Sequence, residues 1–160
     1  MNLNEITKLI REYMMFEYIQ DPDFPDDPTK LIKVETDINK AINGNIYSSY
    51  IDNDSQFPCI TNHILNGTQG ISPDNGDVTV QCKVWTNNNK NPSGILYAVY
   101  ALIKKAFFSE EGNPNLENDI LYLTVYMREN TALPTMIQEV YEGNVLYSLP
   151  FYIDCKAIFL

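Results

Sequence analysis

The most regular hydrophobic pattern in the chain lies between residues 77 and 108. Apolar and polar residues alternate over 77–86, as is typical of a strand with one buried face. The buried face would comprise Val78, Val80, Cys82 and Val84, and the opposite face Thr79, Gln81, Lys83 and Trp85. After a polar loop, apolar residues recur at helical spacing and predict a helix over 92–108 that can lie on a sheet. Asn91 is placed to cap this helix, and Pro92 suits its first position.

Two further helices are expected before this unit. Residues 4–19 place apolar side chains on one side, and Asn4 can cap their start. The segment 21–28, DPDFPDDP, would end this helix as an exposed acidic loop, because three prolines among four aspartates do not support regular structure. Residues 29–42 favour a second helix, although their β-branched residues weaken the pattern, and Gly44 would terminate it.

Alternation and turn residues predict five strands along the chain. They are expected at residues 46–51, 57–65, 77–86, 119–129 and 145–160. The strand over 57–65 opens with Pro58, which is tolerated at the start or edge of a strand. It would pair antiparallel with 77–86. The last two strands would pair with each other, joined by a long connection over 130–144.

The element order predicts a single α+β domain over residues 1–160. A mostly antiparallel sheet of four to five strands would carry the helices, the N-terminal one and that over 92–108 among them, on one face. A chain of 160 residues can bury about 70 % of its unfolded surface. Its 44 % apolar and 20 % charged residues are ordinary for a globular protein, so a disordered chain is excluded.

The net charge of −10 narrows the classes of partner. An acidic surface repels phosphate backbones and anionic lipids, so neither sequence-specific nucleic-acid binding nor membrane binding is expected. No apolar run reaches the roughly 20 residues of a transmembrane helix. The N-terminus lacks the basic start and apolar centre of a signal peptide, which favours a cytoplasmic protein.

The single histidine and three cysteines are the residues most able to carry chemistry. His63 with Cys59, Cys82 and Cys155 matches the ligand count of a zinc site, but the spacing contains no CxxC pair. Buried free thiols and a strand histidine are the simpler interpretation, so no metal is expected. For a Cys–His nucleophile pair, Cys59 is two alternations from His63, whereas Cys82 could meet His63 across neighbouring strands.

Other chemistry has less support. The aspartate pairs, such as Asp52 with Asp54, lie in turn-rich loops where their side chains usually bond their own backbone. The segment 21–28 lacks the glycine and the distal glutamate of an EF-hand loop. No glycine-rich nucleotide motif occurs. We therefore expect no catalytic residue and no cofactor, which favours a binding or assembly role.

Five residues are candidates for contacts with partners. Trp85 lies opposite the valines and could either pack on the sheet or act at an interface. Asn88 and Lys90 lie in the polar loop before the helix, and Met136 and Tyr141 in the connection 130–144. Exposure is the reason for choosing these last four residues.

Residues 56–107 resemble the tail terminator (tail completion) proteins of long-tailed bacteriophages. The resemblance rests on a short strand ending at Tyr47, a Phe-Pro-Cys-Ile strand start at 57–60, the Val-Trp-Thr turn at 84–86 and the long helix that follows. An N-terminal helix before these motifs and two antiparallel strands after them complete the order of elements. The segments 22–43 and 130–144 are longer here than is typical of that family.

The resemblance implies an α+β subunit of a homo-hexameric ring without catalytic activity. Such a ring would cap the tail tube, stop tube polymerisation and offer a surface for head docking. The partners would be the tail tube protein and the head connector or neck protein. The subunit would belong to the tail or neck of the virion and be assembled in the host cytoplasm. A neck or head-completion protein that binds the connector, a small cytoplasmic enzyme using His63, and a non-viral adaptor domain remain alternatives.

Overall fold

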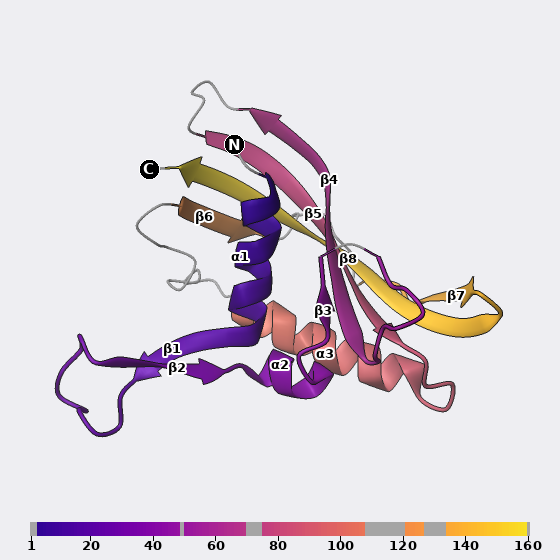
Figure 1. Cartoon of the computed structure of the whole chain (residues 1–160), viewed down its shortest axis with the longest axis horizontal. Coiled ribbons are helices and arrows are strands. Elements are labelled where there is room, and N and C mark those ends of the chain that lie inside the picture. The colour runs from indigo at the N-terminus through magenta and orange to yellow at the C-terminus, as the bar shows by residue number, and fades with distance from the viewer. Residues whose placement is uncertain (1–2, 49, 70–74, 108–120, 127–133, 160) are drawn as a thin grey trace.

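A mostly antiparallel main sheet, a separate two-stranded sheet of β1 and β2, and three helices make up the described part of the chain (Figure 1). The computed structural model describes residues 3–48, 50–69, 75–107, 121–126 and 134–159. The helices are α1 (Leu3–Met15), α2 (Asp37–Ile42) and α3 (Pro92–Phe107). The strands are β1 (Phe16–Gln20), β2 (Leu31–Glu35), β3 (Ile46–Tyr47), β4 (Cys59–Gln69), β5 (Asn75–Thr86), β6 (Leu121–Tyr126), β7 (Ile137–Tyr141) and β8 (Asn144–Phe159). The predicted α+β class is confirmed.

The main sheet is organised around two long strands, β5 and β8. Its order is β3-β4-β5-β8-β6, and β7 pairs with the start of β8. Among the strand pairs of the described residues, β3 with β4 is the one parallel pair. The predicted antiparallel pairing of β4 with β5 is confirmed, with Ile60 opposite Val84. The predicted pairing of the strand over 119–129 with the C-terminal strand is also confirmed, as β6 pairs with β8.

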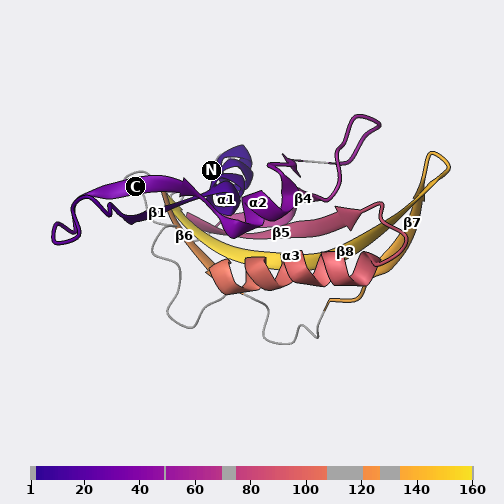
Figure 2. The same cartoon turned by 90° about the horizontal axis from the view of Figure 1, so that it is seen from below.

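One face of this sheet carries the hydrophobic core. Val80 and Val84 of β5 face the same way as their β8 partners, Ile153 and Leu149. All three helices contribute to the same cluster, so the predicted packing of helices on one face is confirmed. Figure 2 shows α3 running along β5 and β8. The buried helical residues of this core are Ile6, Ile10, Met14, Ile38, Ile42, Leu96, Val99, Tyr100 and Ile103.

Helix α3 begins where the sequence predicts. The Asn91 side-chain oxygen accepts a hydrogen bond from the Gly94 N–H at 3.2 Å, which caps the helix. Pro92 is the first helical residue, where its missing N–H leaves no hydrogen bond unmade. No described helix has the length and apolar character needed to cross a membrane.

The N-terminal helix is shorter than predicted. It ends at Met15 rather than residue 19, and β1 follows at once. The prediction of helix over 29–42 is likewise wrong for its first half, which forms β2. These two short segments, β1 and β2, pair with each other and place Ile19 opposite Ile32. The pairing gives their backbone N–H and C=O groups hydrogen-bond partners.

The second half of 29–42 does form a helix, α2. The Thr36 hydroxyl accepts a hydrogen bond from the Asn39 N–H at 3.1 Å and so caps its start. Asn43 ends the helix in the left-handed conformation at φ 52°, and Gly44 follows at φ 73°. Gly44 is therefore one residue beyond the capping position.

The connection predicted over 130–144 is also wrong in its described part. Residues 137–141 form β7, which makes a tight hairpin with β8 through Glu142 and Gly143 at φ 48° and 82°. The strand predicted over 46–51 is reduced to β3. Strand β6 lies inside the predicted range 119–129, whose remaining residues lie outside the described part.

Candidate interaction surface

The face of the sheet opposite the helices carries a groove of about 480 Å³. Strands β4, β5 and β7 and the loop after β3 form its walls. The groove is lined by Tyr50, Ile51, Thr61, His63, Gln81, Lys83, Trp85, Glu139, Val140 and Tyr141. The register explains the meeting of the central residues, because Thr61 lies opposite Lys83 and His63 opposite Gln81. Residues on alternate strand positions thus form an aromatic and polar surface away from the core.

Trp85 lies at the base of this groove. Only 8 % of it is exposed, and it packs with Ile51, Cys59 and Leu146 in a second, smaller cluster. Its indole N–H donates a hydrogen bond of 2.9 Å to the Thr61 hydroxyl. The prediction that Trp85 faces away from the valines is confirmed. Packing accounts for most of its surface, and an interface role stays a prediction.

Lys83 crosses the groove between an aromatic ring and a carboxylate. Its ammonium nitrogen lies 5.1 Å from the centre of the Trp85 ring and 3.8 Å from a carboxylate oxygen of Glu139. The other oxygen of Glu139 accepts a hydrogen bond of 2.7 Å from the Ser148 hydroxyl. These contacts hold the positive charge in place and link β5 to β7. Glu139 was not predicted as a site residue because the sequence did not indicate β7.

His63 forms another part of the wall, and its ring centre lies 5.3 Å from that of Tyr50. Burial, and after it the positive charge of Lys83, lowers the pKa of His63 below its ordinary value. The imidazole is therefore neutral at neutral pH. Its Nδ1 atom is buried and has no hydrogen-bond partner among the described residues.

The cysteines do not assemble with His63 as a nucleophile pair. Cys82 is buried in the core and pairs in register with Asn62, so it lies on the face opposite His63. The predicted approach of Cys82 to His63 is wrong for this reason. Cys59 shares the face of His63, but burial raises its pKa to about 12 and keeps the thiol protonated.

Metal ligation finds no further support in the described residues, which contain no cluster of three side chains able to bind a metal ion. The side chain of Cys155, the remaining cysteine of the proposed zinc set, lies outside the described part. Asp21, Asp27 and Asp52 behave as predicted for turns. The Asp52 and Asp21 carboxylates accept hydrogen bonds of 2.9 Å from backbone N–H groups two residues later.

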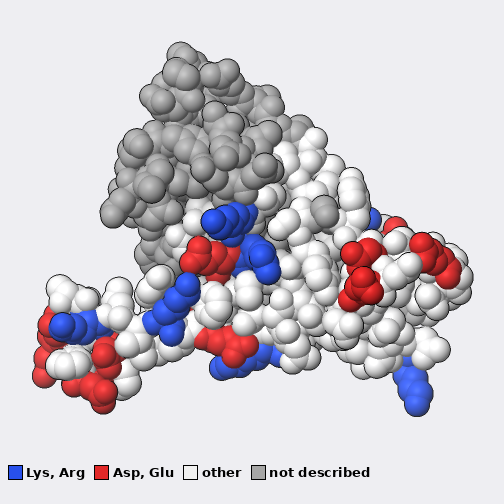
Figure 3. All heavy atoms as spheres, in the orientation of Figure 1, with Lys and Arg blue, Asp and Glu red and all other residues white. Residues whose placement is uncertain are grey.

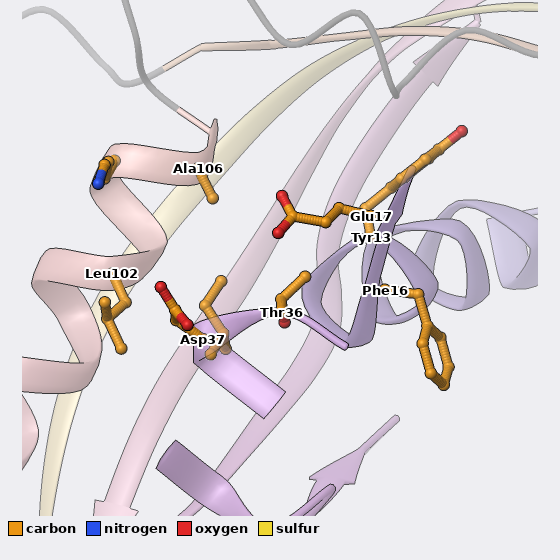
Figure 4. A pocket seen from close by; sticks show the side chains of 9 residues that line it. Tyr13, Phe16, Glu17, Thr36, Asp37, Leu102 and Ala106 are labelled. Carbon is orange, nitrogen blue, oxygen red and sulfur yellow. The ribbon is translucent and has the colours of Figure 1, made fainter. Parts of the chain in front are cut away.

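A second hollow, of about 330 Å³, lies where the ends of α1 and α3 meet the starts of β1 and α2 (Figure 4). It is lined by Tyr13, Phe16, Glu17, Thr36, Asp37, Ile38, Leu102, Lys105 and Ala106. In Figure 4 the carboxylates of Glu17 and Asp37 both point toward the α3 side of this space. The Asp37 carboxylate lies 3.9 Å from the Lys40 ammonium, so part of its charge is balanced locally.

The five predicted contact residues lie in three different settings. Trp85 and Tyr141 meet in the groove and its cluster, where Tyr141 is partly buried, so its predicted exposure is wrong. Asn88 and Lys90 lie exposed in the loop before α3, which the Asn88 side chain orders by accepting a hydrogen bond of 2.9 Å from the Lys90 N–H. Met136 is partly buried against the main core, so its presumed exposure is wrong because β7 pairs with the sheet.

No protein-family model matches this chain, and no curated protein matches it. The resemblance to tail terminator proteins therefore stays a prediction from the sequence motifs.

Proposed function

We propose that this chain is a structural subunit of a homo-hexameric ring that caps a phage tail tube, as the resemblance to tail terminators implies. The observation that carries the proposal is the open face of the sheet. Its groove is lined by Tyr50, Trp85 and Tyr141 and lies on the side that the helices leave uncovered. Tyrosine and tryptophan are enriched where protein surfaces meet, because they bury apolar area and still satisfy a polar atom.

In this proposal the groove receives a neighbouring protein surface. Tyr50, which is 74 % exposed, supplies an apolar ring at the rim, and the His63 ring lies beside it in the groove. Lys83 and Glu139 are already paired with each other, so an incoming surface need not balance a buried charge. Subunits joined in this way would form a ring that ends tube growth and leaves its outer side for the head connector.

The first test combines solution mass with binding to purified tail tubes. Light scattering over a range of protein concentration should show a hexamer, or a monomer that becomes a hexamer on tubes. Negative-stain images should then show a ring at one tube end and no further elongation. A protein that stays monomeric under both conditions and leaves tube growth unchanged would refute the proposal.

A pair of matched variants tests the groove itself. Tyr50→Lys places a charge at the exposed rim, and Ala101→Lys places the same charge at an exposed position of α3, on the other side of the sheet. Assembly should be weakened by about tenfold or more in the first variant and be unchanged in the second. Equal effects from both variants would remove the groove from the assembly surface.

The same preparation separates this proposal from the alternative of a neck or head-completion protein. Such a protein would bind purified heads in preference to purified tails. For the enzyme alternative, the described residues no longer support a thiol nucleophile, because Cys82 lies in the core and the Cys59 thiol stays protonated. An enzyme would have to use His63 with other groups, and His63→Ala would then abolish an activity without changing assembly.

A further inference from the structure

The β1–β2 hairpin forms an arm, residues 16–35, that projects from the body of the molecule (Figures 1 and 2). No residue of this arm is buried. Four of its large apolar side chains are between 42 and 54 % exposed, namely Tyr18, Ile19, Phe24 and Leu31. A two-stranded hairpin is only marginally stable in water by itself, so an arm with these side chains gains stability when another surface covers it.

The tip of the arm, residues 21–30, is ordered by hydrogen bonds within the arm. The two N–H donors of the Gln20 side-chain amide are shared among three carbonyl oxygens, those of Phe24 at 2.7 Å, Asp27 at 2.6 Å and Lys30 at 3.1 Å from the nitrogen. The Asp21 N–H donates to the Lys30 carbonyl at 2.9 Å and closes the loop. Because the tip already has a defined shape, binding a partner costs little further ordering.

The root of the arm is fixed to α1. The Lys33 ammonium lies 3.1 Å from the Glu12 carboxylate and 4.5 Å from the centre of the Phe16 ring. The Thr36 hydroxyl, directly after the arm, donates to the Met14 carbonyl. A strand of five residues spans about 16 Å, so the arm holds its tip at a fixed place away from its own α1.

The negative charge of the arm tip indicates that its partner surface is positively charged. Negatively charged side chains gather at the tip, as Figure 3 shows at the outer end of the arm. The carboxylates of Asp23 and Asp26 have no ion pair with any described residue. On α1 the outward side chains Lys8 and Arg11 are exposed and also lack an ion pair in the described part. An acidic tip and a basic helix face are therefore present on the same chain.

We propose that the arm tip of one subunit docks on the outer face of α1 of the next copy of this chain. Phe24 would lie against that helix, with Asp23 and Asp26 facing Lys8 and Arg11. Two different surfaces meet in such a contact, and repeated contacts of this kind close into a ring when the rotation allows. The inference rests on the ring proposed above, since it adds a second contact between successive subunits beside the groove.

Photo-cross-linking from the tip tests this contact directly. A benzophenone analogue of phenylalanine replaces Phe24 in an equal mixture of ¹⁵N-labelled and unlabelled chains, alone and on tail tubes. We expect cross-links between labelled and unlabelled chains that map to the peptide 3–15. The same analogue at Val145 is the control and should give no cross-link to that peptide. A ring whose cross-links from position 24 are absent or map elsewhere would refute the arm contact alone, and a strict monomer without interchain products would refute ring and arm together.

A charge exchange gives an independent readout. Lys8→Glu with Arg11→Glu, or Asp23→Lys with Asp26→Lys, should each raise the dissociation constant of assembly by about tenfold. All four substitutions in one chain should restore it to within about threefold of the wild type, because every tip and every helix face is then inverted. Circular dichroism confirms that each variant folds. Weakened assembly without such a recovery would show that these charges do not face each other.

Discussion

The hydrogen bond between Trp85 and Thr61 allows a quantitative test of how the groove is built. The donor and acceptor atoms are 2.9 Å apart, and the two residues are 8 % and 2 % exposed. Thr61→Val keeps the size of the side chain but leaves the indole N–H without its partner. An unsatisfied buried donor costs about 1–3 kcal/mol, so we expect a loss of about 2 kcal/mol in the free energy of unfolding.

Trp85→Phe removes the donor and part of a buried ring. It should cost about 2–3 kcal/mol, from lost apolar contact and an unused Thr61 hydroxyl. In the double variant neither polar group remains, so its cost should be about 1–2 kcal/mol less than the sum of the single costs. For a chain of 160 residues each kcal/mol corresponds to about 2–4 °C in Tm.

Urea unfolding followed by far-UV circular dichroism measures all four chains, since the Phe variant loses the only tryptophan. Thr86→Val is the matched control. Thr86 is equally buried but lies on the opposite face of β5, where its hydroxyl accepts a hydrogen bond from the Asn88 N–H. Its cost should be the same with Trp or Phe at position 85. A Trp85–Thr61 coupling within about 0.5 kcal/mol of zero would refute the reasoning.

Three further predictions concern other parts of the fold. Thr36→Ala should lower the free energy of unfolding in urea by about 1–2 kcal/mol, because it removes the cap of α2 and the hydrogen bond to the Met14 carbonyl, whereas Thr36→Ser should keep most of it. Because the pKa of His63 is lowered in the folded state, its contribution to the free energy of unfolding is fully present above about pH 6.5 and is lost as the pH falls toward the folded-state pKa. His63→Asn should remove this part of the decrease in the free energy of unfolding between about pH 7.5 and 5.5. An unchanged slope in the variant would contradict the assignment of the decrease to His63. Burial raises the pKa of Cys59 to about 12, so its thiol should not react with an aromatic disulfide reagent in the native protein. Cys59→Ser should therefore bind as many equivalents of the reagent as the wild type when native, and one fewer in denaturant. If the native variant bound one equivalent fewer than the native wild type, Cys59 would not be buried.

The helices and strands that could be predicted from the sequence are those with a long hydrophobic repeat of one unambiguous period. The alternation over 78–84 matches only a strand, and the stripe of α3 only a helix, so both types are decided within a few turns of chain. The cap at Asn91 and the aspartate turns are local as well, because a short polar side chain reaches its own backbone wherever the chain lies.

Short apolar runs were predicted wrongly where a distant partner decides their conformation. Residues 16–19 continue the helical stripe of α1 but become strand because 31–35 lie beside them. Strand β7 has no clear alternation of its own and is stabilised by its register with β8. Trp85 could be named as a contact candidate from its residue type and strand face, whereas the partly buried positions of Met136 and Tyr141 depend on the pairing of β7.

Hydrophobic period, helix capping and turn residues predict the α+β class, the nucleus formed by β5 and α3, and the acidic turns. The three-dimensional fold places His63 and Cys82 on opposite faces, brings Glu139 to Lys83, and makes β1 and β2 a projecting arm. Period and capping act over a few residues, whereas strand register joins positions far apart in the chain. The registers of β4 with β5, of β5 with β8 and of β8 with β7 bring β4, β5 and β7 together around the groove. No local sequence pattern contains that information.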